Sequence, residues 1–209
     1  MKMRHKGILI VVSGFSGAGK GTLMKELVRT YENYALSVSM TTRSPRPGEE
    51  EGKEYFFVSE EKFKEKIRQD GLIEYANYCG HYYGTPRAYV ERQLEKGKDV
   101  ILEIEIQGAL KIKEKFPTAL LIFVMPPDAA ELKKRLEGRG TESPEVIAQR
   151  IRRAREEASG IEEYDFLIIN DRLEECVKEM HVLIQAAHNT PIRNAQLIQN
   201  MRKELEALV

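Results

Sequence analysis

The chain of 209 residues has no tryptophan, only two cysteines and no long apolar run. Cys79 and Cys176 lie far apart and outside any metal-ligand spacing, so we expect two reduced thiols and neither a disulfide framework nor a zinc site. The apolar run behind the basic N-terminus, Ile8 to Val12, is too short to cross a membrane. It also lacks the small-residue cleavage site of a signal peptide. These absences favour a cytoplasmic protein.

Net charge is absent too, because 33 lysines and arginines balance 33 aspartates and glutamates. A neutral balance argues against a protein that coats a nucleic acid polymer or an anionic membrane. We therefore expect small-molecule partners, and both a monomer and a homo-oligomer stay open. The length suits one compact domain with insertions better than two domains.

Short apolar runs, rich in β-branched residues, recur along the chain and indicate strands buried on both faces of a parallel sheet. They cover Ile8 to Val12, Val100 to Ile106, Ala119 to Met125 and Phe166 to Ile169. Helical patterns separate them, at Thr22 to Tyr31, Ala109 to Phe116, Asp128 to Glu137 and Pro144 to Ala158. This alternation predicts an α/β fold with a mostly parallel central sheet.

Three further helix starts are marked by capping residues. Thr85-Pro86 and Thr190-Pro191 each place a hydroxyl before a proline at the first helical position, and the second predicts a terminal helix towards Leu208. Asp171 is expected to cap a helix over Arg172 to about Ala187.

The alternation of strand and helix patterns is interrupted over residues 37–90 by glycines, prolines and tyrosines. We predict an insertion there with short strands and one helix, Glu60 to Gln69, set in a core formed by residues 1–36 and 91–209. A second irregular piece, Gly138 to Ser143, separates two arginine-rich helices and predicts a mobile lid over about residues 136–150.

The strongest motif follows the first strand and reads Gly14-Phe15-Ser16-Gly17-Ala18-Gly19-Lys20-Gly21-Thr22. Strand, glycine spacing, lysine and helix start follow the order of a phosphate-binding P-loop, whose backbone N–H groups and helix N-terminus bind phosphate oxygens. Lys20 is expected to reach the β- and γ-phosphates of ATP. Gly21 stands where the strict pattern has Ser or Thr, an ending that resembles adenylate kinases. Mg²⁺ is therefore expected to rest mainly on ATP oxygens and water, with help from Thr22, and no residue is assigned as a firm metal ligand.

A second segment reads Ser37-Val38-Ser39-Met40-Thr41-Thr42-Arg43-Ser44-Pro45-Arg46-Pro47-Gly48-Glu49. It resembles the Ser-x-Ser-x-Thr-Thr-Arg-x-Pro-Arg-x-Gly-Glu segment of guanylate kinases. The resemblance continues, in the same order and spacing, through Gly52 to Val58, Leu72 to Ala76 and Tyr82 to Thr85, and it runs from about Ile8 to Asp171. It implies a P-loop NTPase-type three-layer fold, with a small α+β nucleotide-binding insertion and a helical lid. The implied activity is ATP-dependent phosphorylation of GMP.

Two arginines of this segment suit a phosphate. Arg43 and Arg46 are planar, permanently charged forks three residues apart, able to clamp a phosphate dianion. The resemblance implies that role for both, with Tyr55 and Tyr83 as phenolic donors to the same phosphate of GMP.

Glu74 is implied as the purine selector. Guanine presents N1–H and an exocyclic N2 amine side by side, and one carboxylate can accept from both. Adenine has no proton at N1 and would leave part of a buried carboxylate unsatisfied, which generates strong discrimination. Ser39 and Thr85 resemble the family's hydroxyl partners of the base.

Glu103 and Glu105 fall two apart in an apolar run, which predicts that both project from one face of a strand near its C-terminal end. In a parallel sheet that end faces the ligand crevice. The two acids are expected to hold Mg²⁺ through water or to orient the acceptor nucleotide. The family usually carries aspartate at one or both positions.

The resemblance also implies arginines that fold over the phosphates from the lid. These are Arg135, Arg139 and Arg150. Asn170 resembles the family's residue beside the adenine of ATP. The neighbouring Arg152, Arg153 and Arg155 match no site, and we interpret them as a solvated helix face.

The mechanism expected from these residues is in-line transfer of the γ-phosphoryl group of MgATP to the phosphate of GMP, giving ADP and GDP. Both reacting phosphates are anionic, so catalysis is mainly positioning and charge neutralisation. The expected electrostatic catalysts are Lys20, Arg43, Arg46, Arg135, Arg139 and Arg150. Two alternatives stay open: a kinase of this fold for another acceptor such as AMP or dGMP, and a guanylate-kinase-like scaffold module without ATP chemistry.

Overall fold

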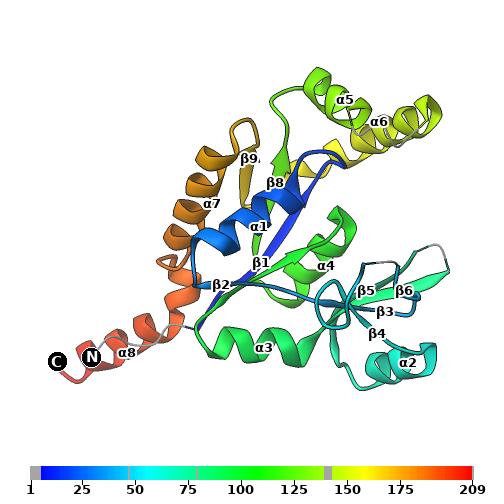
Figure 1. The fold of residues 1–209 in the computed structure, drawn as a ribbon. Coiled ribbons are helices and arrows are strands. Elements are labelled where there is room, and N and C mark those ends of the chain that lie inside the picture. Colours follow the sequence, from blue (N-terminus) through cyan, green and yellow to red (C-terminus); the bar gives the residue numbers. More distant parts are fainter. Residues whose placement is uncertain (1–5, 47, 79, 139–142, 209) are drawn as a thin grey trace.

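A five-stranded sheet forms the centre of the molecule (Figure 1). The computed structural model describes residues 6–46, 48–78, 80–138 and 143–208. All neighbouring strands of this sheet run parallel, in the order β2-β7-β1-β8-β9. The strands are β1 (Leu9–Gly14), β2 (Tyr34–Leu36), β7 (Asp99–Glu103), β8 (Leu120–Met125) and β9 (Phe166–Ile169). The prediction of an α/β fold with a parallel sheet is confirmed.

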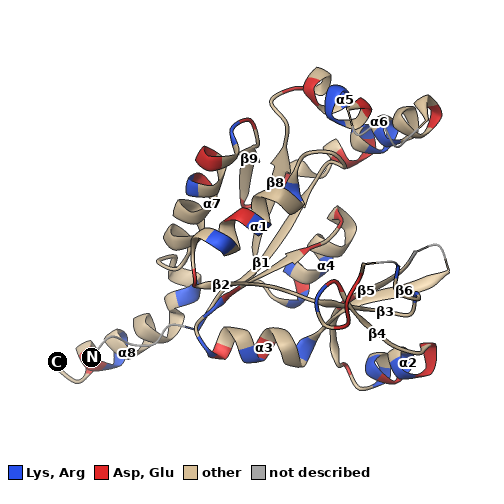
Figure 2. Ribbon diagram, viewed as in Figure 1, with Lys and Arg blue, Asp and Glu red and all other residues tan. Residues whose placement is uncertain are grey.

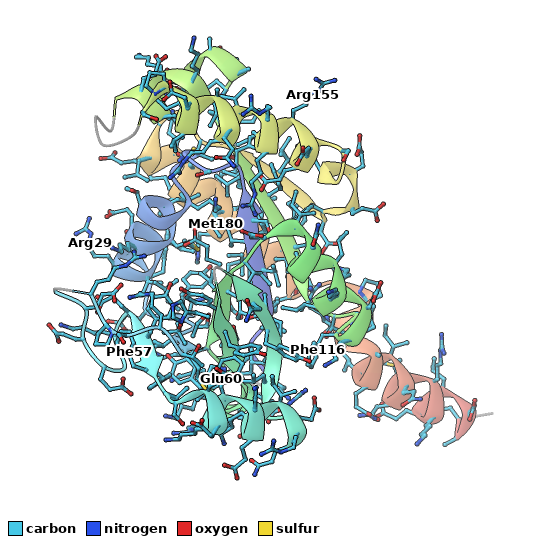
Figure 3. All side chains as sticks on the ribbon, turned by 90° about the vertical axis from the view of Figure 1, so that its right-hand side faces the viewer. Arg29, Phe57, Glu60, Phe116, Arg155 and Met180 are labelled. Atoms are coloured by element: carbon cyan, nitrogen blue, oxygen red, sulfur yellow. The ribbon has the colours of Figure 1, made fainter. Side chains whose placement is uncertain are left out.

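Helices cover both faces of this sheet and make three layers (Figure 1). On one face lie α1 (Lys20–Thr30) and α7 (Leu173–Ala187), whose Leu23 and Met180 join a buried cluster with Ile10 of β1. Figure 3 labels Met180 in this core. On the other face lie α3 (Arg87–Glu95) and α4 (Ile106–Lys115), packed against β1 and β7. The apolar runs that predicted these strands are apolar throughout because both faces are covered.

A second, four-stranded sheet has the order β4-β3-β6-β5. Its strands are β3 (Ser39–Thr41), β4 (Tyr55–Phe57), β5 (Leu72–Tyr78) and β6 (His81–Pro86). Helix α2 (Glu60–Arg68) is capped by Ser59 and packs on the sheet through Phe63, which meets Met40 and Leu72 in a small separate core. These elements fall within the insertion predicted over residues 37–90. A boundary at residue 90 would divide α3, and the division into parts stays a prediction.

The remaining helices lie at the two ends of the molecule. Asp128 accepts a hydrogen bond from the Glu131 backbone and caps α5 (Ala129–Glu137), which packs against α6 (Pro144–Ala158) through Leu132, Leu136 and Ala154. After the short η1 (Ile161–Glu163), β9 and α7, the chain forms η2 (Pro191–Asn194) and α8 (Ala195–Glu206). Helix α8 projects from the body (Figure 1).

The structure corrects two of the predicted caps and refines the third. Thr85 is a buried residue of β6, and α3 begins only at Arg87, because the Thr85 hydroxyl is used inside the second sheet. Asp171 does not cap α7; that helix is preceded by Arg172 in an extended conformation. Pro191 does open a helix, but its first turn is a 3₁₀ turn before α8.

Across the part of the chain that is described, no helix combines the length and the apolar character that crossing a bilayer requires. Figure 2 shows lysines and arginines interspersed with aspartates and glutamates along the helices, in keeping with the balanced composition.

Candidate active site

The glycine-rich loop joins the end of β1 to the start of α1. Gly19 precedes the helix with φ of 85°, and Lys20 is its first residue. The Lys20 ammonium folds back over the loop and donates to the carbonyl oxygens of Gly14 and Phe15, at 2.8 and 3.1 Å. The loop thus places a helix N-terminus and a lysine at the carboxyl edge of the parallel sheet, where an anion binds favourably.

Asn170 holds this loop from behind. It lies directly after β9, is buried, and its side-chain nitrogen donates to the Ala18 carbonyl at 2.8 Å. A Cβ on Gly19 would lie 2.5 Å from that nitrogen, so both the left-handed backbone and the close approach require glycine there. The amide nitrogen of Asn170, predicted to lie beside adenine, is thus used to brace the loop.

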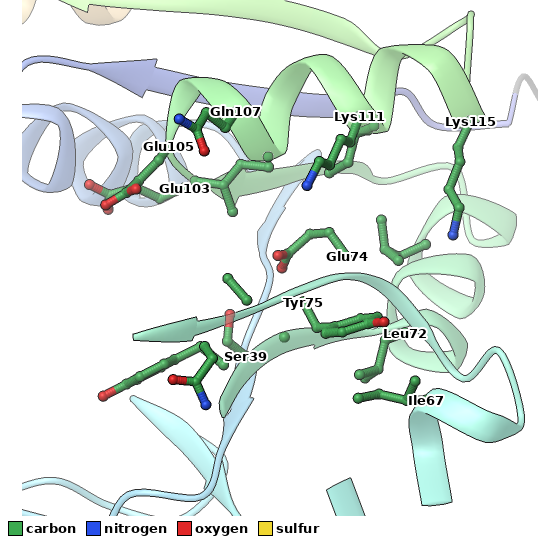
Figure 4. A pocket seen from close by; sticks show the side chains of 18 of the residues that line it. Ser39, Ile67, Leu72, Glu74, Tyr75, Glu103, Glu105, Gln107, Lys111 and Lys115 are labelled. Carbon is green, nitrogen blue, oxygen red and sulfur yellow. The ribbon is translucent and has the colours of Figure 1, made fainter. Parts of the chain in front are cut away.

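Two cavities share a wall, and one of them opens beside the glycine-rich loop. The first, here called the phosphate cavity, has a volume of about 820 Å³ and is lined by Ser16, Lys20, Glu54, Gln149, Arg150, Arg153 and Glu157, among others. The second, here called the base cavity, has a volume of about 600 Å³ and is lined by Leu72, Glu74, Tyr75, Gly84, Gln107, Lys111 and others (Figure 4). The shared wall consists of Ser39, Tyr55, Glu103, Ile104 and Glu105. Two ligands placed in these cavities would therefore meet end to end.

Arg150 of α6 reaches the glycine-rich loop. Its Nη1 donates to Ser16 Oγ at 2.6 Å, which connects the predicted lid to the loop. Arg135 of α5 bonds to Glu131 at 2.8 Å, four residues away on its own helix. Arg139 lies outside the described residues, as does Cys79. Of the two predicted lid arginines that are described, Arg150 lines the phosphate cavity and Arg135 does not.

Glu103 and Glu105 both line the phosphate cavity, but the prediction that they share one strand face is wrong. Strand β7 ends at Glu103, and Glu105 already precedes helix α4. The chain leaves the sheet at Ile104, whose carbonyl accepts from the buried Ser13 hydroxyl at 2.7 Å. This turn brings the two carboxylates together at the sheet edge, whereas the prediction relied on the alternation of side chains along a strand.

Arg153 is exposed, as the interpretation of a solvated helix face expects, but it is not an isolated surface charge. Arg153 lines the phosphate cavity and pairs with Glu105 at 2.6 Å and with Glu157 at 3.1 Å. Sequence reasoning missed both Arg153 and Glu157. The only signal was their spacing: Arg150, Arg153 and Glu157 lie three and four residues apart, on one face of a helix.

Of the predicted acceptor-phosphate residues, Tyr55 and Tyr83 lie on the second sheet and line the base cavity, whereas Arg43 and Arg46 lie on the turn after β3 and line neither cavity. Strand register places Ser39 beside Tyr55 and Thr41 beside Tyr83. The Tyr55 and Tyr83 rings meet edge-on at 5.9 Å, and the Arg43 guanidinium lies 5.4 Å from the centre of the Tyr55 ring. Burial raises the pKa of the Tyr55 phenol, which keeps it a hydrogen-bond donor.

Glu49 organises the two arginines, a role that sequence reasoning did not assign. Its carboxylate accepts from Arg43 Nη2 at 2.8 Å and from the Arg46 backbone nitrogen at 2.7 Å. The Arg43 hydrogen bond is the largest of the effects that lower the pKa of Glu49, so the carboxylate is ionised at neutral pH. Glu49 thereby holds the turn after β3 in one shape.

Glu74 faces the base cavity because of an irregularity in β5. The pairing of β5 with β6 shifts between Leu72 and Tyr75, which leaves an extra residue on the β5 side. The Glu74 carboxylate accepts from the Thr85 hydroxyl at 2.8 Å. Gly84 permits this close packing, since a Cβ there would lie 2.8 Å from the Glu74 carbonyl oxygen.

The electrostatic environment of Glu74 disfavours its ionised form unless further hydrogen-bond donors approach it. Burial raises the pKa of its carboxyl, and hydrogen bonds from Thr85 only partly offset that effect. A carboxylate has about four acceptor positions, and the bonds from Thr85 leave some of them for a ligand. Donors from a ligand would therefore relieve the cost of burying this charge.

The donor chemistry at the sheet edge fits a magnesium ion that is held mainly by its nucleotide. Glu103 and Glu105 supply carboxylate oxygens beside Lys20. Within the described ranges, no cluster of three or more His, Cys, Asp or Glu residues is arranged to hold a metal. Mg²⁺ commonly binds through one or two carboxylates together with substrate phosphates and water, and these residues fit that mode.

Comparisons with known proteins identify the family of this chain. A family model described as Guanylate kinase matches residues 6–187. Guanylate kinase of Streptococcus thermophilus (strain CNRZ 1066) is 54% identical over 187 residues, which cover 89% of this chain and 90% of the relative. The corresponding protein of Caldanaerobacter subterraneus subsp. tengcongensis is 47% identical over 204 residues, covering 98% and 99%. A crystal structure of guanylate kinase from Anaplasma phagocytophilum aligns with a TM-score of 0.71 and 34% identity over 90% of each chain.

Proposed function

The chain belongs to the guanylate kinase family, and on that premise we propose that it transfers the γ-phosphoryl group of ATP to GMP, giving ADP and GDP. ATP occupies the phosphate cavity with its phosphates on the glycine-rich loop, and GMP occupies the base cavity. The wall that the two cavities share, from Ser39 to Glu105, is where the reacting phosphates meet.

The observation that carries the choice of acceptor is the buried Glu74 carboxylate beside Thr85, 2.8 Å from its hydroxyl. Guanine N1–H and its N2 amine would satisfy this carboxylate, whereas adenine would leave it with an unmet acceptor. Discrimination of this kind is strong because an unpaired buried polar group costs about 1–3 kcal/mol or more.

The residues around the transfer site act by position and charge. Arg43, Arg46, Tyr55 and Tyr83 bind the phosphate of GMP, which aligns an acceptor oxygen with the γ-phosphorus. Lys20 and Arg150 bind the phosphates of ATP and offset the charge that develops during transfer. No general base is needed, because a phosphate oxygen of GMP is already ionised at neutral pH.

Magnesium belongs to the proposal as well. When bound, Mg²⁺ would neutralise charge on the β- and γ-phosphates of ATP. Glu103 and Glu105 are the protein residues that would hold it, through water. We also propose a cytoplasmic location, as the sequence suggests, and leave the oligomeric state open.

An assay of coupled ADP release with GMP, dGMP, AMP and UMP tests the proposal. We expect turnover with GMP and much slower turnover with AMP and UMP. Equal rates with AMP and GMP would contradict the role of Glu74. No turnover with any acceptor, in folded protein that binds ATP, would favour the scaffold alternative.

A further inference from the structure

Arg153 connects the α5–α6 pair to the central sheet at the phosphate cavity. Its Nη2 lies 2.6 Å from Glu105 Oε1, at the start of α4, and its Nε donates to Glu157 Oε1 at 3.1 Å. The Arg153 side chain is 45% exposed and that of Glu157 is 20% exposed. The arginine thus bridges two acids that come from different elements.

The charged residues that line the phosphate cavity indicate what the Arg153 ion pairs do. Among the described residues, three cations line it, Lys20, Arg150 and Arg153, together with four carboxylates, those of Glu54, Glu103, Glu105 and Glu157. Burial raises the pKa of Glu157, and the charge of Arg153 is the largest effect that opposes the rise. A nucleotide triphosphate must enter this same space. Acids left without a cation there would repel it.

Arg150 and Arg153 lie on one face of α6 and contact different parts of the molecule. They lie three residues apart, so their side chains emerge about one turn apart on the same side of the helix. Arg150 reaches the glycine-rich loop at Ser16, and Arg153 reaches Glu105 on the acceptor side. Together they attach α6 to both walls of the phosphate cavity.

We propose that Arg153 is a positioning residue for phosphoryl transfer: it neutralises Glu105 and Glu157 and keeps α6, with Arg150, beside the bound triphosphate. This inference rests on the proposed function. The Glu105 side chain reaches Arg153 on α6, and the pairing offsets part of the carboxylate charge that faces the nucleotide.

The first experiment compares Arg153→Gln with Arg153→Lys and with a matched control, Arg155→Gln. Arg155 lies on the same helix and points away from the body (Figure 3). We expect Arg153→Gln to lower kcat/KM for ATP about threefold to tenfold, the range for a partly exposed charge pair in a functional site. Arg153→Lys should retain most of the activity, the KM for GMP should change less than that for ATP, and Arg155→Gln should match the parent protein.

A double-mutant cycle separates positioning from simple anchoring of the helix. If Arg153 acts by neutralising Glu105, the double variant Arg153→Gln/Glu105→Gln should show a smaller loss than the product of the two single losses. A shared fall in melting temperature without this coupling would overturn the proposal, as would an Arg153→Gln variant that behaves like Arg155→Gln.

Calorimetry with an inert ATP analogue keeps this inference distinct from the proposed function. Weaker binding to Arg153→Gln, with unchanged binding to Arg155→Gln, supports the ionic role whether or not GMP is the acceptor; equal binding by both variants overturns it. A parent protein that binds the analogue but does not phosphorylate GMP would overturn only the proposed function.

Discussion

The glycine-rich loop after β1 and the turn after β3 are both proposed to bind phosphate, but with different parts of the chain. The loop offers backbone groups and a helix N-terminus, fixed by the parallel sheet and braced by Asn170. The turn offers the Arg43 side chain, which pairs with Glu49 and lies over the Tyr55 ring, and Arg46, whose backbone nitrogen donates to Glu49. Backbone recognition is the same for any triphosphate, whereas side-chain recognition can be tuned to one acceptor.

The two regions also differ in how they are held. The five-stranded sheet is buried between two large clusters that include residues of α1, α7, α3 and α4. The second sheet packs mainly on a smaller cluster around Met40, Phe63 and Leu72, while Ile73 of β5 joins one of the two large clusters. A region with fewer buried apolar contacts opens at a lower free energy. The second sheet, which carries the proposed acceptor residues, is therefore expected to open at a lower free energy than the central sheet.

The largest effect is expected in the glycine-rich loop, where the phosphates of ATP are proposed to bind. Lys20→Ala should lower kcat by at least about a hundredfold, the scale for losing one preorganised charge at the developing phosphoryl group. Lys25→Ala, an exposed position on the same helix, is the control and should be silent. A Lys20→Ala variant with near-normal turnover would remove Lys20 from the mechanism.

On the acceptor side, Glu74→Gln should lower kcat/KM for GMP about tenfold to a hundredfold, because the amide can accept only part of what the carboxylate accepts. The KM for ATP should stay within about twofold if the two regions act separately. Steady-state kinetics with GMP and AMP measure both effects, and Glu91→Gln, exposed on α3, serves as the control. Unchanged selectivity between the purines would contradict the role of Glu74.

The ionisation of Glu74 should make acceptor use pH-dependent. Burial raises the pKa of this carboxyl, and only the ionised form accepts both guanine protons. As pH falls through the raised pKa, kcat/KM for GMP should fall towards about tenfold per pH unit. The substrate phosphate titrates equally for the parent protein and for Glu74→Gln, so the ratio of their pH profiles isolates Glu74. A constant ratio would show that Glu74 does not titrate in this range.

The smallest expected effect concerns the support of the arginines. Glu49→Gln should raise the KM for GMP about twofold to fivefold, because Arg43 loses the carboxylate that orders its side chain. The rise should stay small because the released guanidinium can still bind the phosphate of GMP. Glu50→Gln alters the adjacent, exposed carboxylate and should leave the KM unchanged. An increase in the KM for ATP of the same size would mean that the turn supports the whole molecule and not the acceptor region alone.

Most of the fold follows from local patterns. The glycine-rich loop, β9 and α6 are found where the sequence predicted them, since hydrophobic periodicity and turn chemistry are properties of neighbouring residues. The prediction for Thr85 was wrong for the same reason. A hydroxyl before a proline has the local form of a helix cap, but Glu74, eleven residues away, draws Thr85 into the sheet.

By itself, the sequence determined where phosphate-binding backbone occurs, that the sheet is parallel, and which residues resemble a guanine site. Only the tertiary structure decided that Glu105 pairs with Arg153, that Asn170 braces the loop, and that a shift in the β5–β6 pairing presents Glu74 to the cavity. The first group depends on residues close together in the chain. In the second, two of the contacts join positions 48 and 152 residues apart and the third depends on strand register, so packing of whole elements selects them.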